Sequence, residues 1–233
     1  METKIYRSEQ RGQANYGWLN ARYSFSFSNY YNPENIRFGV LRVLNDDIIQ
    51  PGMGFGTHPH DNMEIITIPL EGALKHKDSM GHQSVITVGD VQVMSAGTGV
   101  HHSEFNASEE KPLNLFQIWI FPHRDGLKPR YEEKRFEPEP GKLVLLVSPD
   151  GRDGSLSINQ NAFISRIKLE AGKQFGYEVY SKGNGLFVIV IEGTASISGE
   201  TLGKRDAATI KKAGNIAVAA SANLDLLIVE VPV

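Results

Sequence analysis

The sequence predicts an all-β fold built as a sandwich or a barrel. Short runs rich in branched and aromatic residues recur along the chain, and 23 glycines and 11 prolines supply the turns between them. No stretch carries a sustained apolar stripe with the 3.6-residue period of a helix. Many short strands at close spacing with glycine turns favour a closed or two-sheet architecture. The clearest expected strands are residues 65–68, 85–88, 91–94, 113–121, 143–147, 163–169, 186–191 and 224–231.

A weak internal repeat predicts two copies of one β module. Leu70-Glu71-Gly72 closes one apolar strand, and Ile191-Glu192-Gly193 closes another in the second half. Residues 89–93 are similar in sequence to residues 214–218, and each copy then ends in a long apolar strand. The polar, proline-bearing stretch 122–141 is the expected connection between the copies.

Composition narrows the function classes. The net charge is −3, from 24 basic and 27 acidic side chains, and no dense basic run is present. Direct partners such as nucleic acid or an anionic membrane are therefore not expected. The absence of cysteine removes disulfides, cysteine-ligated zinc, iron–sulfur clusters and thiol nucleophiles. A polar start at residues 1–8 and a longest apolar run of only Leu186 to Ile191 predict a cytoplasmic protein.

Two short motifs carry the strongest chemical signal. His58-Pro59-His60 and His102-Ser103-Glu104 each place two ligating side chains two residues apart. Side chains alternate faces along an extended segment, so both groups of a pair point the same way. Three neutral imidazoles and one carboxylate suit a divalent transition ion and leave room for exogenous ligands. All seven histidines lie at or before His123, so only the first copy is expected to bind a metal.

The residues around these motifs support the same interpretation. Glycine-rich segments at residues 51–57 and 96–100 precede the two pairs, and glycine lets backbone approach a buried centre closely. His101 adjoins His102 and should face away from the metal. Glu64 shares a strand face with His60 and is expected to support the site or the structure, with a fifth ligand as the alternative.

The other polar and aromatic candidates have simpler expectations. Expected surface residues are His76, His82 and His123; expected core residues are Met94, Phe116 and Trp119; and Asp46 with Asp47 is expected to form a turn.

These motifs resemble a known family. The spacing Gly52-x5-His58-x-His60-x3-Glu64, followed by a glycine turn and a further histidine, is similar to the two-part cupin motif. The finer pattern resembles pirins in Thr57-His58-Pro59-His60, Asp78-Ser79-x-Gly81, Gly89-Asp90-Val91-Gln92-x-Met94 and Ser95-Ala96-Gly97-x-Gly99-x2-His102-Ser103-Glu104. The match covers nearly the whole chain, although the second half matches in architecture only.

The resemblance implies a bicupin, with two cupin β-barrels in tandem. Residues 1–135 would form the N-terminal barrel with the metal site, and residues 136–233 a C-terminal barrel without metal ligands. Carried over position by position, the ligands are His58, His60, His102 and Glu104. The fourth ligand is then Glu104 rather than Glu64, which holds the position of the usual cupin carboxylate.

The resemblance also implies an activity. Some pirins, bacterial ones especially, act as quercetin 2,3-dioxygenases, which open the central ring of a flavonol with O2. We therefore expect a metal-dependent dioxygenase that takes a flavonol-like aromatic substrate, with Glu104 as the catalytic base for the 3-hydroxyl proton. Iron is the expected ion, and Zn, Mn, Ni, Co and Cu are alternatives.

Two other functions use the same ligands. One is a non-catalytic, redox-sensitive metal-binding regulator that acts through a protein partner, as described for nuclear pirins of animals. The other is a cupin with a structural metal and no turnover.

Overall fold

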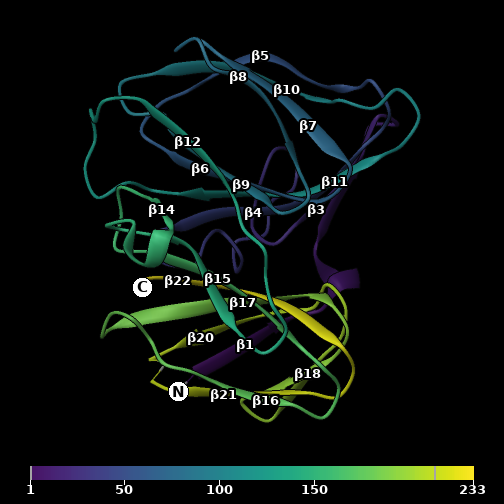
Figure 1. Ribbon diagram of the computed structural model, residues 1–233, viewed down its shortest axis with the longest axis vertical. Coiled ribbons are helices and arrows are strands. Elements are labelled where there is room, and N and C mark those ends of the chain that lie inside the picture. The colour runs from purple at the N-terminus through teal and green to yellow at the C-terminus, as the bar shows by residue number, and fades with distance from the viewer. Residues whose placement is uncertain (1, 213) are drawn as a thin grey trace.

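The computed structural model describes residues 2–212 and 214–233, which fold into two β-barrels stacked one on the other (Figure 1). Each barrel combines a seven-stranded sheet with a four-stranded sheet. The two seven-stranded sheets face each other in the middle of the molecule, and the four-stranded sheets lie outside them. This architecture confirms the all-β prediction.

The first barrel is the upper one in Figure 1. Its strands are β2 (Gly12–Asn15), β3 (Leu19–Tyr23), β4 (Leu41–Ile49), β5 (Gly54–His60), β6 (Glu64–Glu71), β7 (Ala73–Asp78), β8 (Gln83–Thr87), β9 (Asp90–Ser95), β10 (Val100–Asn106), β11 (Leu113–Ile120) and β12 (Arg130–Arg135). The seven-stranded sheet has the order β12-β9-β6-β11-β4-β3-β2, and the four-stranded sheet has the order β5-β10-β7-β8.

The second barrel repeats this plan. Its strands are β13 (Leu143–Ser148), β14 (Leu156–Ser157), β15 (Phe163–Leu169), β16 (Gln174–Tyr177), β17 (Asn184–Glu192), β18 (Ala195–Ile197), β19 (Glu200–Leu202), β20 (Ala207–Lys211), β21 (Ile216–Ala220) and β22 (Leu224–Pro232), joined by β1 (Glu2–Tyr6). The sheets have the orders β1-β20-β17-β22-β15-β13-β14 and β16-β21-β18-β19. Two short 3-10 turns, η1 (Ser8–Gln10) and η2 (Arg152–Gly154), complete the regular structure of the described residues. None of these residues forms a helix that could cross a membrane.

All eight runs predicted as strands fall on strands, although Val88 and Phe121 lie just past the ends of β8 and β11. The stretch 122–141 is more than the expected connection, because β12 within it pairs with β9 of the first barrel. β12 was not predicted as a strand because its sequence is polar. It forms the edge of its sheet, where one side faces solvent.

The first strand departs from the expected division of the chain at residue 135. β1 belongs to the second barrel, where Glu2 lies opposite Lys211 and Tyr6 opposite Ala207 on β20. Tyr6 then packs against Phe187, with ring centroids 6.1 Å apart. The boundary at residue 135 itself stays a prediction.

The internal repeat is real, but one predicted correspondence is wrong. β6 and β17 take the same place in their sheets, so the Glu-Gly ends at residues 71–72 and 192–193 correspond. β11 and β22 are likewise equivalent. Residues 89–93 start β9 of a seven-stranded sheet, whereas residues 214–218 start β21 of a four-stranded sheet. The shared glycine-to-valine pattern therefore does not mark equivalent positions.

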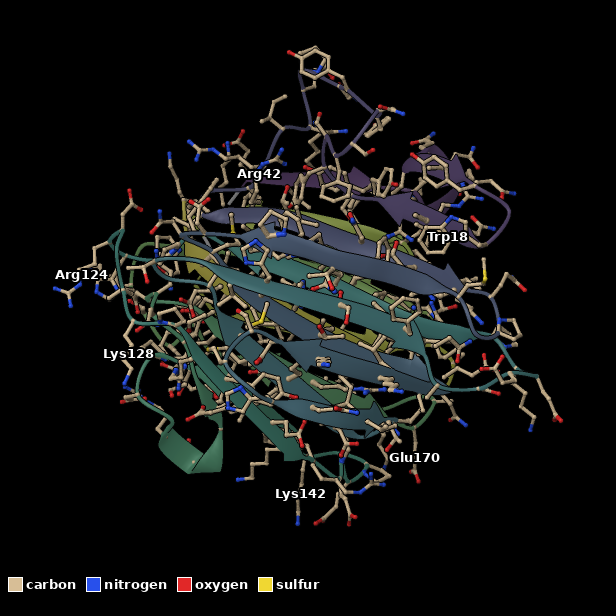
Figure 2. The ribbon with its side chains drawn as sticks, turned by 90° about the horizontal axis from the view of Figure 1, so that it is seen from above. Trp18, Arg42, Arg124, Lys128, Lys142 and Glu170 are labelled. Carbon is tan, nitrogen blue, oxygen red and sulfur yellow. The ribbon has the colours of Figure 1, made fainter. Side chains whose placement is uncertain are left out.

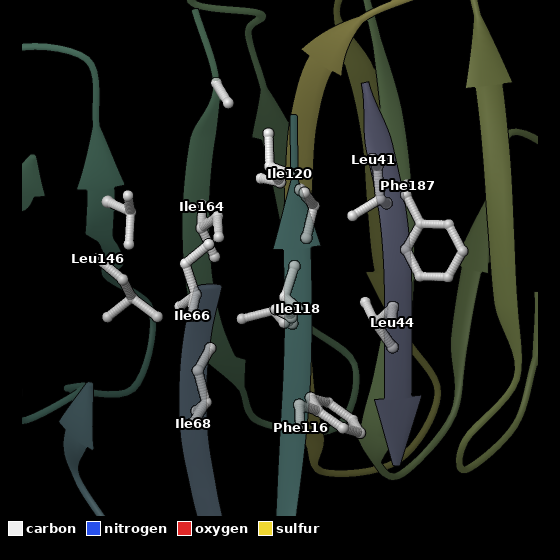
Figure 3. Close-up of a cluster of buried hydrophobic side chains, with 14 of the residues drawn as sticks. Leu41, Leu44, Ile66, Ile68, Phe116, Ile118, Ile120, Leu146, Ile164 and Phe187 are labelled. Atoms are coloured by element: carbon white, nitrogen blue, oxygen red, sulfur yellow. The ribbon is translucent and has the colours of Figure 1, made fainter. Parts of the chain in front are cut away.

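A large apolar core joins the two barrels. Leu44, Ile66 and Phe116 from the first seven-stranded sheet pack against Ile164 and Phe187 from the second (Figure 3). Side chains alternate along each strand, so the opposite faces of the same sheets line the barrel interiors. Burying a side chain of this size contributes about 1.5–3 kcal/mol each, which makes the seam a main source of stability.

The two barrel interiors differ in polarity. The second is filled by apolar side chains, among them Leu186, Val188 and Ile228. In the first, buried polar groups separate two smaller apolar clusters. The site that these polar groups form therefore lies in the first barrel.

Candidate metal centre

Three of the four predicted ligands converge inside the first barrel. β5 and β10 are antiparallel neighbours in which His58 lies directly opposite His102. His60, two residues further along β5, points to the same face. One ligating nitrogen from each imidazole lies within 4.8 Å of the others, and the ring centroids are 4.4–4.9 Å apart.

The glycine-rich approach to the first pair has the predicted role. Gly54 begins β5 directly beside β10, and a Cβ atom at this position would clash with the carbonyl oxygen of Glu104. The missing side chain thus allows the two strands that carry the predicted ligands to approach each other.

Hydrogen bonds orient two of the imidazoles. His58 Nδ1 donates to the carbonyl oxygen of Gly56 at 2.8 Å, which leaves Nε2 with its lone pair. His102 Nδ1 lies 3.3 Å from His76 Nε2, and His102 Nε2 is buried without a hydrogen-bond partner. A buried acceptor without a partner, facing two further imidazoles, is the arrangement that a metal ion satisfies.

Burial keeps His60 and His102 neutral. Burial lowers the pKa of His60 to about 4, with His58 adding to the effect. It lowers the pKa of His102 to about 2, again with help from the neighbouring histidines. Metal binding requires deprotonated imidazole, so the donor set fits a divalent transition ion at neutral pH.

Glu104 reaches the same cavity but stands apart from the three-histidine cluster. Its carboxylate accepts hydrogen bonds from Gln117 Nε2 at 3.1 and 3.2 Å and from Thr67 Oγ1 at 3.5 Å. Burial raises its pKa to about 7, against the effect of these donors. Its roles as fourth ligand and as base stay predictions.

The prediction for His76 is wrong: this residue was expected at the surface and is fully buried. β7 alternates so that Leu74, His76 and Asp78 point inward, and His76 lies opposite Glu104 on β10. Its ring stacks on Tyr131 with centroids 5.1 Å apart. The signal available in the sequence was the two-residue alternation of β7, whose intervening lysines point to solvent.

The other histidines behave as predicted. His101 and His123 are exposed, and the His82 side chain is 43% exposed and contacts Asp78. Hydrogen bonds hold the carboxylate of Glu64 in place: its oxygens accept from Ser95 Oγ at 2.8 Å and from Asn159 Nδ2 at 3.1 Å.

A cavity of about 360 Å³ opens onto the histidines. Its walls are largely aromatic, and comprise Tyr16, Trp18, Tyr23, Phe27, Phe55 and Trp119. Trp18 lies in the turn between β2 and β3 and is labelled in the view onto the first barrel (Figure 2). Trp119 was expected in the core and instead lines this cavity, edge-on to His60 at 4.9 Å. Met94 and Phe116 are core residues, as predicted.

A second prediction, for Asp47, is also wrong. The expected turn at Asp46 and Asp47 does not exist, because β4 runs through both residues and pairs with β3 and β11. Asp47 lines the cavity, and its Oδ1 is buried without a hydrogen-bond partner. Burial, with Asp46 and Glu104 nearby, raises the pKa of Asp47 well above its usual value. The cavity therefore holds two carboxyl groups with raised pKa values.

The chain matches known proteins over nearly its whole length. Residues 5–120 match the family described as Pirin, and residues 145–231 match the quercetinase C-terminal cupin domain. A quercetin 2,3-dioxygenase of Escherichia coli strain K12 is 42% identical over 228 residues, which cover 98% of each chain.

Two solved structures are also similar to this chain over nearly its whole length. The crystal structure of YhhW from Escherichia coli is 40% identical and gives a TM-score of 0.96, covering 100% of this chain and 99% of that one. A second structure, of the bacterial pirin YhhW in complex with nickel(II), is 39% identical with a TM-score of 0.95 and covers 99% of both chains. The fold is a bicupin, as predicted.

Proposed function

Because this chain belongs to the pirin family, we propose that it is a metal-dependent dioxygenase that opens the central ring of a flavonol such as quercetin with O2. The observation that carries the proposal is the junction of an aromatic-walled cavity with three convergent imidazoles. A sizeable apolar pocket with a few polar groups at its base suits a small aromatic substrate.

The proposed ligands are His58, His60 and His102, with Glu104 as the fourth. When bound, a divalent metal would supply positive charge that favours the deprotonated 3-hydroxyl of a flavonol. Iron is the ion proposed from the sequence, and the nickel(II) complex of a relative supports nickel as an alternative.

Glu104 is the proposed base for the 3-hydroxyl proton. A pKa raised to about 7 lets its carboxylate accept a proton at neutral pH and release it again. Gln117 donates to both carboxylate oxygens and holds the group in place.

The aromatic walls bind and orient the substrate. Trp18 and Phe55 form an edge-to-face pair with centroids 5.1 Å apart, and Trp119 stands beside His60. A planar flavonol packed among these rings would exclude water from the histidine end of the cavity.

The proposal is tested by mixing metal-reconstituted protein with quercetin in air and following the loss of flavonol absorbance. We expect wild-type protein and His101→Ala to consume quercetin, and Glu104→Gln to retain metal but slow turnover by about 100-fold or more. Metal-loaded wild-type protein that leaves quercetin intact would rule out this substrate. Equal rates with Glu104→Gln would remove Glu104 from the role of base.

The regulator function stays the alternative. It would be favoured by a protein partner whose capture depends on the oxidation state of the bound metal while quercetin is left untouched.

A further inference from the structure

A second cavity of about 360 Å³ lies at the seam between the barrels. Asp46 lines it, whereas Asp47, the next residue of β4, lines the metal cavity. Because neighbouring side chains of a strand point to opposite faces, the two cavities lie on opposite sides of the same sheet. The first barrel contributes Arg11 and Arg22 to this second cavity, and the second barrel contributes Arg205.

Arg11 is buried without adequate partners. Its side chain is 1% exposed, yet Nε and Nη1 have no hydrogen-bond partner. Nη2 alone reaches a carboxylate, at 3.4 Å from Asp46 Oδ2. A buried guanidinium normally has its donors paired, because the desolvation of an unpaired charge is costly.

Arg205 points to the same carboxylate from the other barrel. Its Nη1 lies 3.6 Å from Asp46 Oδ2 and makes no hydrogen bond, although it is buried. Nη2 donates to Asn114 Oδ1 at 2.9 Å, and the guanidinium lies over the ring of Phe116 at 5.2 Å. These contacts fix the side chain and leave Nη1 without a hydrogen-bond partner.

Arg22 adds a third positive charge. It lies directly opposite Asp46 in the pairing of β3 with β4, and no carboxylate of the described residues lies within ion-pair distance of it. Lys204 also lines the cavity, but it is paired with Glu192 at 2.7 Å, and Glu9 lies at the exposed edge. The cavity lining therefore combines three guanidinium groups and Lys204 with two carboxylates, Asp46 and Glu9, which leaves a surplus of two positive charges among the lining residues.

We infer that this cavity binds a small phosphate-bearing anion, held across both barrels by Arg11, Arg22 and Arg205. The surplus charge matches the charge of a phosphate monoester near neutral pH. The planar donor forks of arginine match the oxygens of a tetrahedral oxyanion. Inorganic phosphate and a phosphate ester share this chemistry.

The experiment titrates the full-length, metal-loaded protein with sodium phosphate and with glycerol phosphate, at an ionic strength held constant with sodium chloride. We expect saturable binding at one site by calorimetry and a melting temperature that rises with ligand concentration. Tighter binding of glycerol phosphate would identify an ester as the ligand, and tighter or equal binding of inorganic phosphate would identify the free anion.

Arg22→Gln and Arg205→Gln should each weaken binding at least tenfold, whereas Lys142→Gln, an exposed lysine outside the cavity, should not. His102→Ala separates this site from the metal centre and should bind phosphate as the wild type does. No saturable binding, wild-type affinity in both arginine variants, or loss of binding in His102→Ala would each overturn the inference.

Discussion

His76 Nε2 lies 3.3 Å from His102 Nδ1, and this contact couples the tautomer of His76 to that of a predicted metal ligand. If His102 binds metal through its free Nε2, its Nδ1 carries the proton and His76 Nε2 accepts it. His76 then acts on the metal through His102 rather than by binding it. Its burial and its stacking on Tyr131 hold the acceptor in position.

We expect His76→Leu to weaken metal affinity by about 10- to 100-fold, the usual effect of removing a partner of a ligating histidine. His76→Gln should restore part of the affinity, since its side-chain oxygen can accept the same proton. Competition with a chromophoric chelator measures both. His82→Leu is the matched control, because His82 also stacks on Tyr131 but does not contact His102. Unchanged affinity in His76→Leu would exclude this role.

Metal should stabilise the folded chain. The ligand cluster is assembled only in the native state, so a divalent ion should raise the melting temperature in a concentration-dependent way, and a chelator should reverse the rise. His58→Ala should lose most of this shift, while the exposed neighbour His101→Ala should keep it. A shift of equal size in His58→Ala would contradict the proposed site.

The stability of the metal-free protein should depend on Glu104 as pH changes. Burial raises the pKa of Glu104 from 4.5 to about 7. The stability that the neutral Glu104 side chain contributes is therefore fully present below pH 4.5. It is lost as pH rises through 7, where the carboxylate must ionise in a buried site. Glu104→Gln removes this ionisation.

Urea titrations of chelator-treated protein measure this effect. The free energy of unfolding of Glu104→Gln should rise relative to that of the wild type between pH 4.5 and 7, and the difference should reach about 3 kcal/mol above pH 7. The histidines are common to both proteins and do not affect the difference. A difference that stays constant between pH 4.5 and 7 would show that the pKa of Glu104 is not raised in the folded state.

Trp119→Leu should raise the KM for quercetin by about tenfold, because an edge-to-face aromatic wall is lost next to His60. Metal content, read by elemental analysis, should not change. Tyr180→Leu alters a partly exposed aromatic of the second barrel and should leave KM as it is. An unaltered KM in Trp119→Leu would place the substrate elsewhere.

Phe187→Ala should destabilise both barrels together. Phe187 is fully buried in the core that joins the two seven-stranded sheets, and such truncations cost about 3–5 kcal/mol. Fluorescence of Trp18 and Trp119, both in the first barrel, should report the loss although the substitution is in the second. A separate, unshifted transition of the tryptophans would show that the barrels unfold independently.

The sequence predicted the three histidines that converge in the structure more readily than their surroundings. His58, His60 and His102 could be paired because alternation along a strand is a local rule that needs no knowledge of the partner strands. His76 lies between two lysines, so its segment has the polarity of an exposed strand, and only the closed barrel shows which face turns inward. Local pattern therefore gave the inward direction of two segments and missed it in the third.

Long-range pairing explains the remaining errors. Asp46 and Asp47 resemble a turn because polar pairs are rare in central strands, yet each faces a cavity on its own side of the sheet. Nothing in the residues of β1 indicates that they pair with β20 at the other end of the chain. Such contacts depend on the assembled fold rather than on neighbouring residues.

The placement of β1 has a consequence for how the protein matures. Residues 2–6 are translated well before residues 207–211, their neighbours in the sheet. β1 must therefore stay unpaired until the residues of β20 have been synthesised, and the second barrel gains this edge strand only at that stage.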